Sequence, residues 1–435
     1  MGLTARRAAA CVAACAAGAL PGLAAAQGLD QFLSPDNAGA VGEAGLTVTG
    51  RRRADYEAGG VRAGAFVLRP RLVEGLGFES NVAGVARPRG SATMDTAGSF
   101  EAASDLSRMA VTGAVTINDV RYASLPRQSY TTWTARLGVS YDIGRDTASA
   151  QYARLRLNQT ARDLDVPERL SEPMPFTVDV GRLAYRAAFN RLSLTPALEV
   201  SSYAYGGGTV GGTWFGQDYR NRLLATPSLT AAYEFAPRRS ALLVVRDSIA
   251  SYANPQPSQP RRDYNDAAVL AGLDYDVTGL LRVRALVGYE VRSFGAGAYK
   301  AIRSPVAELA ATWTPTGLTT LTASVARRVQ DSADETTAGY AATSARVRVD
   351  HEYRRNVLLQ ASAGLYRNEY RGGGMQSLYA LGAGATYLLN RTVGVSATYD
   401  FLARTSGGSS PVMAGLSRGE SFISNRALLQ VRLSL

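Results

Sequence analysis

The run TTWTARLGVSYDI, residues 131–143, alternates between two kinds of side chain. One set is apolar or aromatic and consists of Trp133, Ala135, Leu137, Val139, Tyr141 and Ile143. The other set is small or polar and includes Arg136 and Asp142. Successive side chains of a β-strand point to opposite faces of a sheet, so this run predicts a strand with one apolar and one polar face. The same alternation recurs in 266–277, 281–291, 340–353, 377–389 and 392–403.

From about residue 64 the chain repeats one unit, made of a strand, a long polar loop, a second strand and a tight turn. Gly, Pro, Asn or paired charges mark eight turns, near 107–108, 144–146, 190–191, 237–239, 278–279, 315–317, 354–356 and 390–391. Nine polar loops lie near 80–97, 122–129, 162–175, 206–221, 254–264, 294–300, 330–338, 371–376 and 405–420. These connections predict an all-β fold, a transmembrane antiparallel up-and-down β-barrel of about eighteen strands. Sixteen strands remain an alternative because several runs are irregular, and an even number places both termini on the periplasmic side.

Aromatic residues recur at one end of the predicted hairpins. They occupy the last lipid-facing position before seven of the eight turns and are Tyr141, Phe189, Phe235, Tyr275, Trp313, Tyr353 and Tyr387. Amphipathic rings prefer the membrane interface, so this set predicts an interface girdle. A soluble β-sandwich, the alternative fold for alternating strands, gives no reason for such a girdle.

The first residues have the pattern of a secretory signal. Arg6 and Arg7 precede an apolar stretch, and Ala24-Ala-Ala26 forms a small-residue cleavage site, so residues 1–26 are predicted to be a signal peptide. Cys15 could instead end a lipoprotein site. Both cysteines of the chain, Cys11 and Cys15, lie in this segment, which excludes disulfides and thiolate sites from the mature protein. We expect residues 27–60 to form a periplasmic N-terminal arm or short plug and residues 61–435 to form the barrel.

The formal net charge is +11, and the basic charge is almost wholly arginine because Lys300 is the only lysine. The arginines are spread singly along strands, which argues against nucleic-acid binding. The residues predicted to line the channel are Arg136, Arg182, Arg186, Arg282, Arg284, Arg292, Arg346, Arg348, Asp274, Glu290, Glu308 and Asp400; Arg154 and Arg156 are assigned to the same face. Two interpretations remain open: a salt-bridged wall that stiffens the barrel, or a channel that mildly favours anions.

Little in the sequence points to catalysis. His351 is the only histidine and is expected to face lipid near the girdle. Without a second histidine or a carboxylate pair, no acid–base site is predicted, and we expect neither a metal nor another cofactor. The glycine-rich loop around Trp214 and Phe215 lacks the lysine of a phosphate-binding loop, and it could fold into the channel or remain mobile.

Three short stretches carry a family resemblance: VTGRRRADY at 48–56, GVRAGAFVLRP at 60–70 and GFESNV at 77–82. They resemble the second family of putative β-barrel porins of proteobacteria, although Ser80 stands where that family usually has a second acid. Members often accompany exopolysaccharide export machinery, so the resemblance implies an outer-membrane conduit for polysaccharide. The run LTVTGRR at 46–52 also looks like the energy-coupling box of TonB-dependent receptors, but too little chain follows for a plug domain.

Together these features predict a non-enzymatic channel in the cell outer membrane. The preferred role is a conduit in exopolysaccharide secretion. The alternatives are a general diffusion porin with mild anion preference and a closed structural or adhesive barrel. Expected partners are outer-membrane lipid and lipopolysaccharide, the barrel-assembly machinery, and polysaccharide with export-complex proteins.

Overall fold

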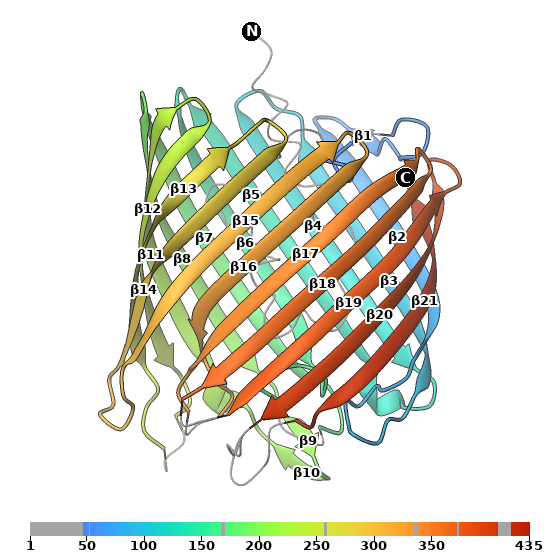
Figure 1. The fold of residues 1–435 in the computed structure, drawn as a ribbon, viewed down its shortest axis with the longest axis vertical. Coiled ribbons are helices and arrows are strands. Elements are labelled where there is room, and N and C mark those ends of the chain that lie inside the picture. Colours follow the sequence, from blue (N-terminus) through green and yellow to red (C-terminus); the bar gives the residue numbers. More distant parts are fainter. Residues whose placement is uncertain are drawn as a thin grey trace.

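The protein forms a single closed β-barrel in the computed structural model, which describes residues 47–51, 53–166, 170–255, 259–334, 337–371, 374–407 and 419–435. Eighteen strands, β2–β8 and β11–β21, pair antiparallel with their neighbours around the ring (Figure 1). The ring closes where the first of these strands pairs with the last, from Arg71 opposite Ser434 to Glu79 opposite Arg426. The predicted up-and-down barrel of eighteen strands is therefore confirmed.

The wall strands are β2 (Phe66–Glu79), β3 (Ser91–Ser104), β4 (Met109–Tyr122), β5 (Tyr130–Ile143), β6 (Asp146–Gln159), β7 (Met174–Phe189), β8 (Leu192–Tyr205), β11 (Arg222–Ala236), β12 (Arg239–Tyr252), β13 (Tyr264–Asp276), β14 (Leu281–Phe294), β15 (Ile302–Thr316), β16 (Thr319–Gln330), β17 (Tyr340–Arg354), β18 (Val357–Tyr370), β19 (Met375–Leu388), β20 (Val393–Gly407) and β21 (Phe422–Ser434). A short strand β1 (Val61–Ala63) pairs with β2, and β9 (Gly208–Val210) pairs with β10 (Thr213–Phe215) in the loop after β8. Two 3-10 turns, η3 (Pro126–Gln128) and η4 (Asp218–Arg220), lie in loops.

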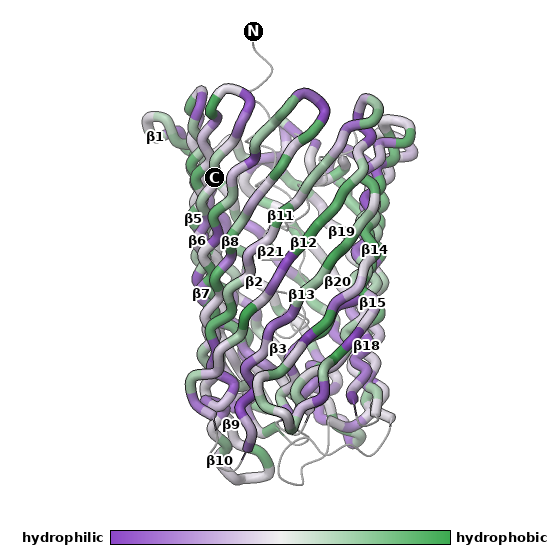
Figure 2. The backbone as a smooth tube through the Cα atoms, turned by 90° about the vertical axis from the view of Figure 1, so that its left-hand side faces the viewer, coloured by the Kyte–Doolittle hydropathy of each residue, from purple (hydrophilic) through white to green (hydrophobic). Residues whose placement is uncertain are grey.

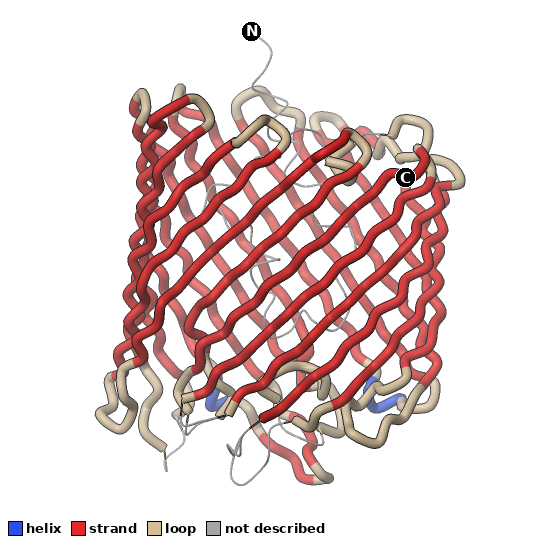
Figure 3. The backbone as a smooth tube through the Cα atoms, in the orientation of Figure 1, coloured by secondary structure: helices blue, strands red, loops and turns tan. Residues whose placement is uncertain are grey.

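Short and long connections lie at opposite ends of the barrel (Figure 3). The eight tight turns and the C-terminus lie at one end, called the turn end below, and the nine longer connections lie at the other, the loop end. Each predicted turn and loop falls between the expected strands. The first loop is shorter than expected, because β3 begins at Ser91, inside the predicted loop 80–97.

The outer surface carries large apolar side chains. Hydrophobic and hydrophilic positions both recur along the strands of the wall (Figure 2). Leu183, Val287 and Leu429 have exposed fractions of 60%, 66% and 59%, as expected for side chains that face lipid. The predicted girdle lies at the turn end: six of its seven aromatics are exposed, namely Tyr141, Phe189, Phe235, Trp313, Tyr353 and Tyr387. The seventh, Tyr275, is half-buried, and the Arg239 guanidinium lies 4.6 Å from its ring centre.

Near the loop end of β6 and β7, apolar side chains face the inside of the barrel and charged ones face outward. The prediction from the sequence that Arg154 and Arg156 lie on the inner face is therefore wrong. Leu155 and Leu157 point inward, where they form a buried cluster with Ala153, Phe176, Val178 and Val180. Arg154 and Arg156 consequently face outward and are exposed. The interior of this part of the barrel is filled by protein rather than water, so the apolar side chains of the strand are buried inside it.

Residues 1–46 lie outside the described part of the chain, so the signal peptide and most of the expected arm lie outside it as well. Residues 47–60, except Arg52, are described and precede the barrel. No described helical segment is long and apolar enough to cross a membrane.

Candidate functional site: the barrel lumen

The polar face of the strands lines the lumen, and it holds each of the predicted channel residues. Strand pairing places Arg182 opposite Glu199, Asp274 opposite Arg284 and Asp400 opposite Arg426, all on the face that alternates with the exposed apolar one. Arg136, Arg186, Arg282, Arg292, Arg346, Arg348, Glu290 and Glu308 occupy the same inner face. The structure thus brings the predicted residues together on one continuous surface.

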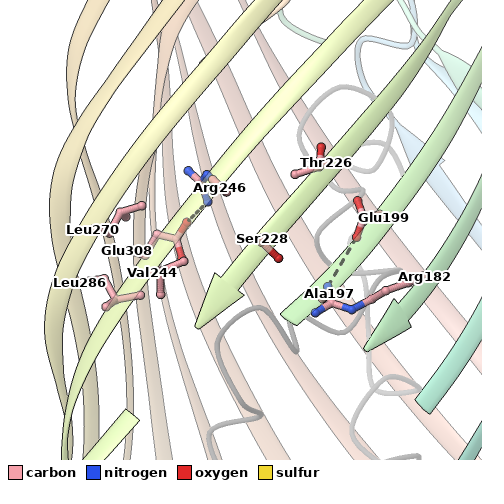
Figure 4. Close-up of a pocket in the computed structure, with 10 residues that line it drawn as sticks. All are labelled: Arg182, Ala197, Glu199, Thr226, Ser228, Val244, Arg246, Leu270, Leu286 and Glu308. Atoms are coloured by element: carbon pink, nitrogen blue, oxygen red, sulfur yellow. Dashed lines mark hydrogen bonds and ion pairs between the residues drawn. The ribbon is translucent and has the colours of Figure 1, made fainter. Parts of the chain in front are cut away.

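Most inner-wall arginines are held by carboxylates. Arg246 lies 3.0 Å from Glu308 (Figure 4). Arg246 also lies 3.7 Å from Glu290, and Arg328 lies 3.2 Å from the same Glu308 oxygen. Further pairs join Arg182 to Glu199 at 3.5 Å, Arg282 to Asp274 at 2.8 Å, Arg292 to Asp266 at 2.7 Å and Arg348 to Asp350 at 2.7 Å. These residues form the ion pairs that a salt-bridged wall requires.

A smaller set of inner-wall arginines lacks such a partner. Among the described residues, Arg136, Arg186 and Arg346 form no ion pair with a carboxylate. Arg346 instead lies with its guanidinium 5.1 Å from the ring centre of Tyr366. Each of these cations leaves positive charge uncompensated on the lumen face, where it can attract an anion.

A small pocket in the inner wall is lined by both polar and apolar side chains. Its polar lining includes Arg182, Glu199, Arg246, Glu308, Thr226 and Ser228, and its apolar lining is Ala197, Val244, Leu270 and Leu286 (Figure 4). The apolar part continues into a buried cluster with Leu242, Ala268 and Val306. The polar side chains of the pocket therefore lie beside a buried apolar cluster in the wall.

The loop after β6 folds into the lumen at the loop end. Its residues 160–166 are all buried, although three of them, Arg162, Asp163 and Asp165, are charged. On the far side, Arg404 of β20 donates from Nη1 to the carbonyl oxygens of Ala161 and Asp163, at 2.8 and 2.7 Å. Arg404 is itself only 1% exposed, so the loop covers it completely.

Apolar packing fixes the tip of this loop. Leu164 is 1% exposed and packs in a cluster with Tyr366, Leu378, Ala380 and Phe422, which come from β18, β19 and β21. Burying a leucine side chain in this way contributes about 1.5–3 kcal/mol. The loop that leaves β6 is thus anchored on the opposite wall of the barrel.

Asp165 joins the loop to a second connection. Its backbone conformation is left-handed, with φ of 56°, and its backbone N–H donates to Gln376 Oε1 at 3.0 Å. Its carboxylate accepts the backbone N–H of Ala333 at 2.6 Å. Loop 160–166 therefore meets residues 332–333 of the loop after β16.

Buried charges accompany this contact. Arg162 pairs with Glu79 on β2, which also accepts the Tyr122 hydroxyl at 2.7 Å. Burial lowers the pKa of Arg162 to about 10, and burial raises the pKa of Asp163 to about 6 against the opposing effect of the Thr160 backbone N–H. Burying a charge is costly unless the charge is paired, and these pairs form only when the loop occupies this position. The contacts therefore fix the loop in place.

The loop before β17 is held in the same manner. Asp331 lies 2.8 Å from Arg222 and 2.6 Å from Arg292 and accepts the Tyr264 hydroxyl at 3.2 Å. Although burial opposes ionisation, these arginines lower the pKa of Asp331 below its ordinary value. Arg262 donates to the carbonyl oxygen of Ser332 at 2.6 Å. Two loops anchored by buried ion pairs therefore narrow the lumen at the loop end.

Comparison with protein families identifies the family to which this barrel belongs. The profile of the family described as Putative beta-barrel porin 2 matches residues 53–433. The chain belongs to this porin family. None of the curated protein sequences compared with it matches.

The solved structures similar to this chain include outer-membrane porins, at low identity. The outer membrane protein opdK from Pseudomonas aeruginosa is 11% identical, with a TM-score of 0.43 over 85% of this chain and 99% of that chain. A BenF-like porin from Pseudomonas fluorescens is 11% identical, with a TM-score of 0.43 over 86% of this chain and 99% of that chain. OccAB4 from Acinetobacter baumannii is 10% identical, with a TM-score of 0.43 over 88% of this chain and 100% of that chain.

This porin is an outer-membrane channel protein rather than an enzyme. His351, whose ring nitrogen lies 3.0 Å from the Thr319 hydroxyl, pairs in register with Leu359, whose side chain is exposed. Within the described residues, no group of three or more His, Cys, Asp or Glu side chains is placed to hold a metal ion.

The sequence did not reveal which loop of this porin folds inward. Trp214 was the candidate, but it lies in the β9–β10 hairpin with 65% of its side chain exposed. The inward loop is the one after β6, and its sequence, TARDLDV at 160–166, looks like an ordinary polar loop. Leu164, which lies between two aspartates, suggests a buried position, but a single leucine in a loop is too common to be diagnostic.

Proposed function

We propose that this porin conducts small hydrophilic solutes, with a mild preference for anions, through a lumen narrowed at the loop end. The observation that carries the proposal is the buried loop 160–166, which extends from β6 to Arg404 on the opposite wall. A barrel of this size has room for an aqueous lumen, and a loop across it limits the size of solute that passes. The inner wall is polar, as a water-filled path requires.

The anion preference rests on Arg136, Arg186 and Arg346. Rings of charged side chains select ions by sign, and a cation without a carboxylate partner contributes most. The many paired arginines contribute little, because their charge is balanced within the wall. The preference is therefore expected to be mild.

The test is single-channel conductance of the refolded mature barrel in a planar bilayer, with the reversal potential measured across a potassium chloride gradient. Steady conductance with an anion-selective reversal potential is expected. The double variant Arg136→Gln and Arg346→Gln should shift the reversal potential toward zero, whereas Arg156→Gln on the outer face should leave it unchanged. Absent conductance would contradict the channel proposal, and an unchanged reversal potential in the double variant would contradict its anion selectivity.

Exopolysaccharide secretion is the finer role implied by the family resemblance, and no specific contact in the lumen favours it. A polymer needs a path that stays wide along its whole length, and two anchored loops over the lumen favour small solutes instead. Loss of surface polysaccharide on deletion of the gene, restored by a wild-type copy, would support the export role and overturn our choice.

We also propose that the loops face the cell exterior and the termini face the periplasm, as is usual for barrels with short turns at one end. An epitope inserted at Gly211, in the β9–β10 hairpin, should then be labelled on intact cells, and labelling only after permeabilisation would reverse the orientation. The outward Arg154 and Arg156 would lie at the level of lipopolysaccharide headgroups, and β21 would be the strand recognised by the barrel-assembly machinery.

A further inference from the structure

The segment that precedes the barrel returns to the turn end instead of leading away from it. β1 pairs antiparallel with β2, and Gly60 beyond it has a φ of 79°. A Cβ at Gly60 would lie 2.8 Å from the Leu68 carbonyl oxygen, so both the conformation and the space there suit glycine. This turn directs the described residues before Gly60 toward the barrel wall.

These residues are bound to the inner face of β16 and β17. Arg53 Nη2 lies 2.8 Å from Glu352 Oε2, and both side chains are 4% exposed. The same Arg53 nitrogen donates to the Val48 carbonyl oxygen at 2.7 Å, and the Val48 backbone N–H donates to Thr320 Oγ1 at 2.8 Å. Arg51 adds a second contact to Glu352 at 3.4 Å and another to the Gly317 carbonyl oxygen.

The other end of the segment lies near a different part of the wall. Arg53 is bound to Glu352 of β17, whereas the residues after Glu57 lead into β1, which pairs with β2. Four strands, β18 to β21, separate β17 from β2 around the ring. The segment therefore runs along the inside of the turn-end mouth from β17 to β2.

The burial of its contacts distinguishes this segment from a loosely attached arm. Thr47, Val48 and Arg53 are 6%, 2% and 6% exposed, comparable to residues inside a folded domain. A buried ion pair that loses one partner leaves the other charge uncompensated, which strongly disfavours the docked state. The Arg53–Glu352 pair is the most deeply buried ion pair between the described part of the segment and the wall, so its loss should favour release of the segment.

We propose that residues 47–51 and 53–57 form a gate at the turn-end mouth, held closed by the Arg53–Glu352 pair, and that release of this pair widens the channel. The gate acts at the opposite end from the loops that limit solute size. It would let the channel change between two conductance states without any movement of the barrel strands.

The experiment uses single-channel recording of the full mature chain. Arg53→Gln and Glu352→Gln should each raise the fraction of time spent in the higher-conductance state about tenfold or more. Exchange of the two charges, Arg53→Glu with Glu352→Arg, should restore much of the wild-type behaviour. The control is Arg62→Gln, which removes an exposed pair with Asp105 at 3.4 Å and should leave gating unchanged.

A disulfide gives an independent measurement. Residues 27–435 contain no cysteine, because the only two in the sequence, Cys11 and Cys15, lie in the predicted signal peptide. Val48→Cys with Thr320→Cys should lock the low-conductance state when oxidised, and reductant should release it. Wild-type gating in both single variants and in the oxidised disulfide variant would overturn the gate, while leaving the proposal of a conducting lumen intact. Absent conductance in every variant, including wild type and the reduced disulfide variant, would contradict both.

Discussion

Replacement of Arg404 by methionine should release the inward loop. Arg404 donates two hydrogen bonds to loop carbonyl oxygens, at 2.8 and 2.7 Å, and a hydrogen bond from a charged donor is worth about 1.5–3 kcal/mol. The variant therefore removes about 3–6 kcal/mol of loop docking. Methionine keeps the apolar contact with the Phe422 ring, over which the guanidinium lies at 4.7 Å.

A loss of about 3 kcal/mol raises the population of the released loop roughly 100-fold. Two readouts follow from the structure. Trypsin should cut after Arg162, which is 5% exposed in the docked loop, and the fragments are identified by mass spectrometry. Single-channel conductance should rise at the same time, because the loop no longer crosses the lumen.

The control is Arg156→Met, which removes an exposed outward arginine on the strand before the loop and should change neither readout. If Arg404→Met fails to form a heat-modifiable barrel, Leu164→Ala tests the same docking from the apolar side at a cost of about 2–5 kcal/mol. A folded Arg404→Met barrel with wild-type cleavage at Arg162 and wild-type conductance would refute the reasoning.

Three further predictions concern the loop, the hairpin and the girdle. Burial raises the pKa of Asp163 from 3.8 to about 6, so the docked loop keeps a proton that the released loop loses between these pH values; docking is favoured as the pH falls and weakens by up to about 3 kcal/mol above pH 6. Channel opening should therefore increase from pH 4 to pH 6 and level off above it, and Asp163→Asn should abolish that dependence; an unchanged dependence in the variant would assign it to another group. Trp214→Ala should leave conductance unchanged and stability within about 0.5 kcal/mol, because the side chain is 65% exposed in a hairpin; altered single-channel current would place it in the solute path. Tyr387→Ala should lower the free energy of unfolding in vesicles by about 1–2 kcal/mol, as measured by urea titration, whereas Tyr387→Phe should retain most of it; equal loss in both would argue against an apolar role.

Alternation and turn chemistry predicted the barrel because both follow from local rules. A strand between lipid and water must alternate, and a tight turn needs residues such as Asn190, whose φ is 22°. The rule failed at Arg154 and Arg156, where the interior is packed with protein. There Leu155 is buried against Phe176 and Val178 inside the barrel, and the arginines take the outer face.

The loop contacts could not be predicted for a different reason. Arg404 and Ala161 are separated by 243 positions in the chain, and Asp165 and Ala333 by 168. No local pattern encodes such a pairing. The same holds for Arg53 and Glu352, which lie 299 positions apart.

The seam between β2 and β21 has a consequence for biogenesis. Residues 71 and 434 must meet before the ring is complete, so every earlier stage leaves two strands with unpaired backbone groups. Such edges attract other chains, which makes an unfinished barrel prone to aggregation. Loop 160–166 contacts both strands of this seam, because Arg162 pairs with Glu79 of β2 and Leu164 packs in the cluster that contains Phe422 of β21, and it would hold the two strands together from inside the barrel. Assembly of this protein is therefore expected to be all-or-none, with insertion of the inner loop and closure of the last strand occurring as one event.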